Sequence, residues 1–199
     1  MERSKSLGGV TGNEILTCAV AAVLTVLLLV EGVTILQLGP LLIPHMFVGL
    51  VLIPPVLLKL GTTGYRFARY YMSSPAYREK GPPLLPLRLM APVLVAATFG
   101  VFVTGVALLV EGHKSNTLLF FHKATFVVWG AVFGIHFLAY APRVLRSLAA
   151  DWSAARRRAV GGSGLRGALV GIALGIGFVL AMALLPTIDA WQGAAGGGG

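Results

Sequence analysis

The chain has 199 residues, of which 56% are hydrophobic and only 12% are charged, yet its formal net charge is +9. About a quarter of the residues of an ordinary soluble domain are charged, so this composition excludes that class. It also excludes a disordered basic tail, which is poor in apolar residues. The basic residues interrupt long apolar runs, so we expect a membrane rather than a nucleic acid as the partner.

Five apolar stretches are long enough to cross a bilayer, which takes about 20 mostly apolar residues. They cover 14–37, 41–60, 89–110, 117–140 and 167–186. The first stretch is too long for the apolar core of a signal peptide and lacks a convincing cleavage site, so we expect a retained helix. The sequence therefore predicts an all-α integral membrane protein that forms a single membrane domain.

The connections between the spans predict the orientation, because cytoplasmic loops retain Lys and Arg. The connections after the second and the fourth span are rich in Arg, whereas the turns at 38–40 and 111–116 together contain one Lys and one Glu. We therefore expect an N-in, C-out protein.

Local signals in chain order refine this picture. Pro54-Pro55, in the middle of the second span, should kink that helix. The segment 61–71 mixes Arg with aromatic residues, a pattern typical of an interfacial segment at headgroup depth. Gly81-Pro82-Pro83 ends any helix before the third span. The Gly-rich tail 193–199 is expected to be flexible.

An internal repeat draws attention to two histidines. The sequence LLVEG occurs at 28–32 and again at 108–112, and each copy is followed by a His just inside the next span, His45 and His122. At about 1.5 Å per residue, both lie within roughly a turn and a half of the outer boundary. Two imidazoles at one depth on two helices can ligate one haem iron from opposite sides, and helix bundles commonly hold such cofactors.

A third histidine extends the pattern. His136 follows His122 by 14 residues, which returns to nearly the same helix face about 21 Å further along the axis. This geometry suits a second haem near the inner surface. The alternative for each histidine is a hydrogen bond to a neighbouring helix, although ionisable groups within spans are rare and usually functional.

Several residues near the outer histidines have two interpretations. Lys114, His113 and Lys123 could bind haem propionates or extend to the interface. Gly49 would allow close approach of either a porphyrin or another helix. Glu31 would accept a hydrogen bond from a ligand imidazole, relay protons or reach the interface, and we expect the interface. The chain contains no recognisable catalytic motif, so no catalytic residue is assigned.

The residues around these histidines resemble a known superfamily. His45 and the run from Leu119 through His122 to His136 look like the ligand helices of membrane cytochromes b of the formate dehydrogenase gamma-subunit and nickel–iron hydrogenase type. The run from His45 through Lys59 to Gly81-Pro82-Pro83 is especially similar to small actinobacterial members. The resemblance implies a four-helix haem-binding bundle plus a fifth transmembrane helix, with His45 and His122 on the outer haem iron and His136 on an inner one.

The chain departs from this superfamily at the inner haem. Members supply the other inner ligand from a His near the cytoplasmic end of the first helix, where this chain has no His between Thr11 and Thr17. Lys59 occupies the repeat position that corresponds to His136, and Met90 is the remaining candidate ligand. We therefore expect one haem b near the outer face, whereas a second haem at His136 lacks a histidine partner.

The resemblance also implies a function. It suggests a b-type cytochrome that transfers electrons at or across the bacterial plasma membrane, as an electron-transfer subunit of an oxidoreductase rather than a stand-alone enzyme. Electrons would be exchanged with a quinone or a partner redox subunit, in contact with membrane lipid. The first alternative is a haem-free structural subunit or scaffold of a larger complex. The second is a transporter, for which the charge expected along a substrate path is nearly absent.

Overall fold

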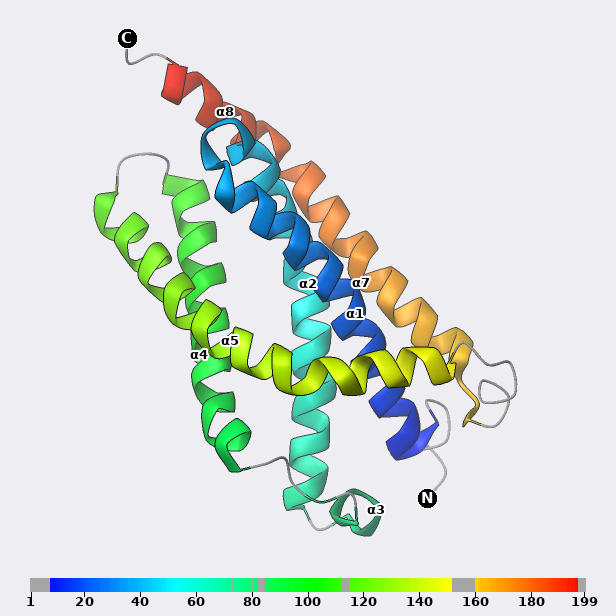
Figure 1. Ribbon diagram of the computed structural model, residues 1–199. Coiled ribbons are helices and arrows are strands. Elements are labelled where there is room, and N and C mark those ends of the chain that lie inside the picture. Colours follow the sequence, from blue (N-terminus) through cyan, green and yellow to red (C-terminus); the bar gives the residue numbers. More distant parts are fainter. Residues whose placement is uncertain are drawn as a thin grey trace.

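A computed structural model describes residues 8–72, 74–79, 81, 85–111, 115–151 and 160–196. The regular elements in these residues are helices: α1 Gly9–Leu36, α2 Leu38–Tyr71, α3 Pro75–Arg78, α4 Leu85–Glu111, α5 Asn116–Asp151, α7 Ser163–Ala183 and α8 Leu185–Gly196 (Figure 1). α1, α2, α4, α7 and the Asn116–Pro142 stretch of α5 are long and apolar enough to cross a membrane. The chain is therefore an all-α, multi-pass membrane protein.

The helix ends differ from the predicted spans because helical backbone continues beyond the apolar runs. α2 continues from residue 60 to Tyr71, so the segment predicted to be interfacial forms its last turns. α5 similarly continues to Asp151. The fifth predicted span is too long at its end, since α7 stops at Ala183 and Pro186 lies in α8. α8 includes the first residues of the Gly-rich tail, through Gly196.

The break in α2 lies near its beginning. Leu41 has the non-helical torsions φ −106° and ψ 17°, whereas the torsions at Pro54-Pro55 remain helical, and the kink expected there stays a prediction. Pro44 accounts for the observed position, because it lacks an N–H for the preceding turn and its ring crowds that turn. The break therefore lies one turn before His45.

The long helices form two hairpins with a fifth helix added. α1 packs against α2, and α4 packs against α5. The hairpins meet where α5 contacts α1 and where α4 contacts α2, and α5 runs obliquely across the other helices (Figure 1). α7 packs along α2, and α8 contacts both α2 and α4.

Two apolar clusters hold these helices together. One joins Leu16, Val20 and Leu24 of α1 to Leu52 of α2. The other joins α2, α4, α7 and α8 through a set of buried side chains: Leu50, Leu109, Ala181 and Ile188. Phe102 of α4 and Leu169 of α7 also pack against the first cluster, so each cluster joins more than two helices and stabilises the tertiary arrangement.

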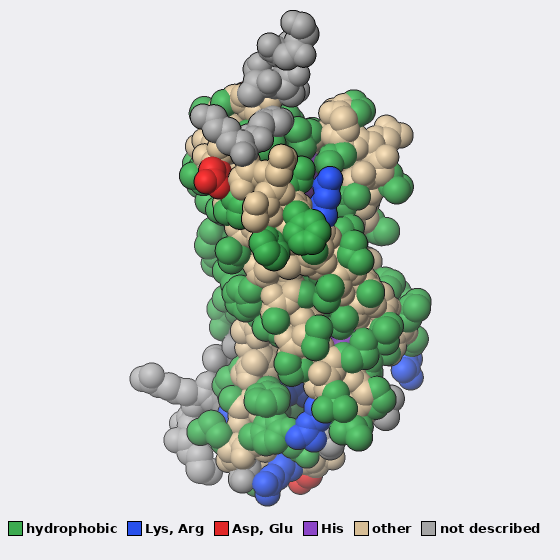
Figure 2. Space-filling model, turned by 90° about the vertical axis from the view of Figure 1, so that its left-hand side faces the viewer, with side chains coloured by type: hydrophobic (Ala, Val, Ile, Leu, Met, Phe, Trp, Pro, Cys, Tyr) green, Lys and Arg blue, Asp and Glu red, His purple; other side chains and the backbone are tan. Residues whose placement is uncertain are grey.

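The outer surface is apolar as well. In Figure 2 hydrophobic side chains cover the middle of the molecule, and most of the visible charged groups lie toward its two ends. Large side chains such as Leu29 and Val110 are 67% and 77% exposed. Water would disfavour such a surface, whereas lipid tails would accommodate it, because the helices already satisfy their own backbone hydrogen bonds.

Candidate functional site

The structure brings His45 and His122 together from different hairpins. His45 lies near the beginning of α2 and His122 near the beginning of α5, and these two ends lie at the same end of the molecule (Figure 1). The ring centroids are 6.5 Å apart, and the ring planes are inclined by 74°. The two side chains that the repeat singled out therefore form one cluster.

His45 is held by the helix that precedes it. Its Nδ1 lies 2.9 Å from Oε1 of Glu31 and 3.2 Å from Oγ1 of Thr34, both on α1. The Thr34 hydroxyl is itself 2.6 Å from the carbonyl oxygen of Glu31. Glu31 is only 9% exposed. The expectation that Glu31 reaches the interface is therefore wrong, because its carboxylate is buried and contacts the His45 imidazole.

His122 is held in a similar way by α4. Its Nδ1 lies 3.1 Å from the carbonyl oxygen of Val101 and 3.1 Å from Oγ1 of Thr104. The Thr104 hydroxyl donates to the carbonyl oxygen of Gly100, at 2.6 Å. Both histidines thus combine a threonine hydroxyl with one stronger acceptor on the preceding helix.

These contacts define which ring nitrogen carries the hydrogen. The Val101 carbonyl can only accept, so Nδ1 of His122 must donate. At His45 the Thr34 hydroxyl hydrogen is directed to the Glu31 carbonyl, so its oxygen offers a lone pair and Nδ1 again donates. Neither Nε2 makes a hydrogen bond to any residue that the structure describes. In its neutral form each imidazole therefore presents an Nε2 lone pair, as metal-binding histidines do.

Two glycines leave space beside the cluster. A Cβ atom at Gly105 would lie 3.1 Å from Cε1 of His122, closer than ordinary van der Waals contact. A Cβ atom at Gly49 would lie 3.5 Å from Oε1 of Glu31, which is an ordinary contact distance. Gly105 is therefore needed for the position of the His122 ring, whereas Gly49 faces the carboxylate that holds His45.

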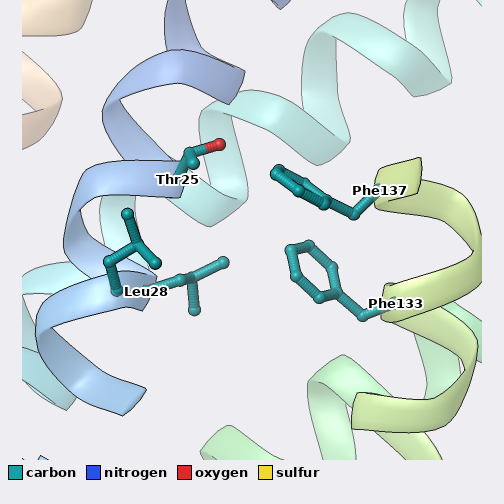
Figure 3. Close-up of a pocket in the computed structure, with 5 residues that line it drawn as sticks. Thr25, Leu28, Phe133 and Phe137 are labelled. Carbon is teal, nitrogen blue, oxygen red and sulfur yellow. The ribbon is translucent and has the colours of Figure 1, made fainter. Parts of the chain in front are cut away.

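A hollow lies between α1 and α5. It has a volume of about 130 Å³, and Thr25 and Leu28 of α1 face Phe133 and Phe137 of α5 across it (Figure 3). Leu29 completes the lining. Pockets for small molecules usually have volumes of about 300–1,000 Å³, so this hollow alone is too small to define a ligand.

Two residues predicted for an inner site, His136 and Lys59, have different surroundings in the structure. His136 stacks on Tyr140, with ring centroids 6.1 Å apart, and its buried Nδ1 has no hydrogen-bond partner. Nζ of Lys59 donates to the carbonyl oxygen of Thr17, at 2.8 Å. Lys59 therefore connects α2 to α1 through this hydrogen bond.

The remaining residues predicted near the outer site lie at the surface or outside the described residues. Lys123 follows His122 on α5 and has an exposed side chain. Lys114 and His113 lie outside the described residues. Thr34 and Thr104 were not identified from the sequence, although Thr34 follows Glu31 by three residues and so shares its helix face. Nothing in the sequence near His122 indicated Thr104.

No group of three or more His, Cys, Asp or Glu side chains in the described residues could hold a metal ion by itself. Comparisons with protein-family models, curated proteins and solved structures find no match to this chain.

Proposed function

We propose that this protein is an integral membrane cytochrome b that binds one haem between His45 and His122 and transfers electrons at or across the bacterial plasma membrane. The supporting observation is the pair of imidazoles whose Nδ1–H groups are engaged by the preceding helices, which leaves two Nε2 lone pairs in one cluster. The resemblance to the formate dehydrogenase and hydrogenase cytochromes supports the same proposal.

The separation of the rings fits two axial ligands. With metal–nitrogen bonds of about 2 Å, imidazoles on opposite sides of one metal ion have their centroids roughly 6 Å apart. The observed separation is 6.5 Å. A bound haem would supply one-electron chemistry at its iron, with a potential that depends on axial ligands, burial and hydrogen bonds. The chain's own contribution is to hold both imidazoles in one tautomer and to surround them with apolar helices.

In the proposed orientation this haem lies near the outer face. The Arg-rich connections would lie inside, so the beginnings of α2 and α5 would lie outside. Electrons would then be exchanged with a quinone near the outer surface or with a partner redox subunit. Lys123, and Lys114 in the adjoining turn, are the proposed partners for the anionic propionates.

The inner haem is a weaker candidate for this chain. His136 has a free Nδ1 but no histidine opposite it among the described residues, and Lys59 is engaged by α1. We therefore propose a single haem and keep His136 as a candidate ligand to be tested. A haem-free scaffold is the second proposal, and it is favoured by the same missing ligand.

A reduced-minus-oxidised spectrum of the purified protein tests the proposal. After expression with added haem and extraction in mild detergent, dithionite should produce b-type absorption bands. His45→Ala and His122→Ala should each abolish them because an axial ligand is lost, whereas His136→Ala should retain them.

Folding must be monitored in the same preparations. The haem content is compared only among variants that elute from size exclusion as the wild type does, because His45→Ala also leaves the buried Glu31 without its partner. A wild-type protein without b-type bands would favour the haem-free scaffold. Loss of half the haem in His136→Ala would instead establish the inner site.

A further inference from the structure

The two histidines differ in the charge of the group that accepts their Nδ1–H. His122 donates to a neutral carbonyl, that of Val101, whereas His45 donates to the carboxylate of Glu31. A charged acceptor makes a stronger hydrogen bond than a neutral one. The two sides of the cluster are therefore chemically unequal, although the repeat places related sequences around both.

Glu31 has few other interactions. Within the described residues no Lys or Arg forms an ion pair with it, and its partners are His45 and the Thr34 hydroxyl. It is 9% exposed, and the backbone of α2 at Gly49 faces Oε1. A buried carboxylate without a permanent cation is costly, so a positive charge on the other side of His45 would stabilise it.

The repeat provides a contrast within the same chain. Glu111 occupies the position in the second LLVEG copy that Glu31 occupies in the first. Its side chain is exposed at the end of α4, and His122 is held instead by Val101 and Thr104. Of the two related glutamates, Glu31 contacts a histidine of the cluster, whereas the exposed Glu111 is not among the residues that hold His122.

We propose that Glu31 is a positioning residue that lowers the reduction potential of the haem iron through His45, an inference that rests on the proposed function. A carboxylate that accepts the Nδ1–H raises the basicity of the ligating Nε2. The more basic ligand, together with the nearby negative charge, stabilises ferric iron more than ferrous iron. Thr34 holds the imidazole in the orientation that this hydrogen bond requires.

A potentiometric titration at one fixed pH tests the inference. Glu31→Gln preserves the size of the side chain and an oxygen acceptor but removes the charge, so the midpoint potential should shift to more positive values while the b-type bands remain. Glu31→Asp moves the carboxylate away by one methylene and should produce a smaller positive shift. Glu111→Gln, the matched control, should leave the potential unchanged.

The outcomes separate this inference from the proposed function. An unchanged potential in Glu31→Gln would overturn the role of Glu31 while leaving the cytochrome proposal intact. If Glu31→Gln does not retain haem, Glu31→Asp decides, because a positive shift supports the role and a wild-type potential overturns it. Absence of haem from the wild type would instead refute the proposed function.

Discussion

Among single residues, a threonine on the preceding helix contacts each histidine in the same way. A threonine hydroxyl donates to a carbonyl three or four residues earlier in its own helix, which leaves an oxygen lone pair for Nδ1 of the His on the next helix. The threonine hydroxyl thus donates its hydrogen within its own helix and accepts a hydrogen bond from the histidine on the other helix of the hairpin. This arrangement orients a ring within an apolar interior, where few other polar groups are present.

Gly105 is needed for this arrangement at His122, because no side chain fits between α4 and the His122 ring. Gly105→Ala would bring a Cβ atom to 3.1 Å from Cε1, so the ring must move by a few tenths of an ångström. Disturbing the support of a ligand commonly reduces cofactor affinity about tenfold or more. We expect a haem titration of the apoprotein to show weaker binding in Gly105→Ala.

Gly130→Ala is the control for this variant, because a Cβ atom there meets nothing within 4 Å. It should bind haem as the wild type does. Wild-type affinity in Gly105→Ala would show that the ring has enough freedom to accommodate the methyl group, and the tight fit would then have no functional role.

At the scale of helices, the contact between α2 and α7 depends on a small residue. A Cβ atom at Gly177 would collide with the carbonyl oxygen of Val51 and lie 3.1 Å from its Cα. Close approach of two backbones through glycine is a common way for membrane helices to associate. The close approach at Gly177 therefore fixes the position of α7 along α2 more tightly than a general apolar contact would.

Gly177→Ala should destabilise the protein, since overpacking costs about 1–3 kcal/mol and would lower the unfolding temperature by several degrees. Cys18 provides the measurement, because it is the chain's one cysteine and is only 6% exposed. A thiol-reactive dye should report its exposure during heating. Gly175→Ala, on the same helix with open space around it, should leave the temperature unchanged or raise it slightly.

At the scale of the whole molecule, charge and position are related. Arg66, Arg69 and Arg78 lie at the end of α2 or in α3, and Arg88 lies near the beginning of α4 with its guanidinium 5.1 Å from the centre of the Tyr71 ring. These residues share the end of the molecule opposite to the His45–His122 cluster (Figure 1). If this end faces the cytoplasm, the cluster lies near the outer surface.

Two serines allow the orientation to be measured. In a Cys18→Ala background, Ser115→Cys marks the turn before α5 and Ser74→Cys marks the connection after α2. A membrane-impermeant thiol reagent should label Ser115→Cys in intact cells, whereas Ser74→Cys should react only after the membrane is permeabilised. The reverse pattern would place the cluster near the cytoplasm and refute the proposed orientation.

Hydropathy predicted the number and approximate extent of the candidate membrane helices, and the internal repeat drew attention to His45 and His122. Hydropathy is a local property, and an apolar run of sufficient length becomes a helix in lipid whatever its neighbours are. Helix ends were less predictable, because α2 and α5 continue into polar segments where hydropathy carries no signal.

The contacts of each histidine could not be predicted from local sequence. The partners Glu31, Thr34, Val101 and Thr104 depend on how far each helix is rotated and shifted along its neighbour. Close contacts such as those at Gly105 and Gly177 exist only at the observed rotation and shift. Helix-to-helix register depends on many side chains at once, so the repeated LLVEG sequence buries one glutamate and leaves the other exposed.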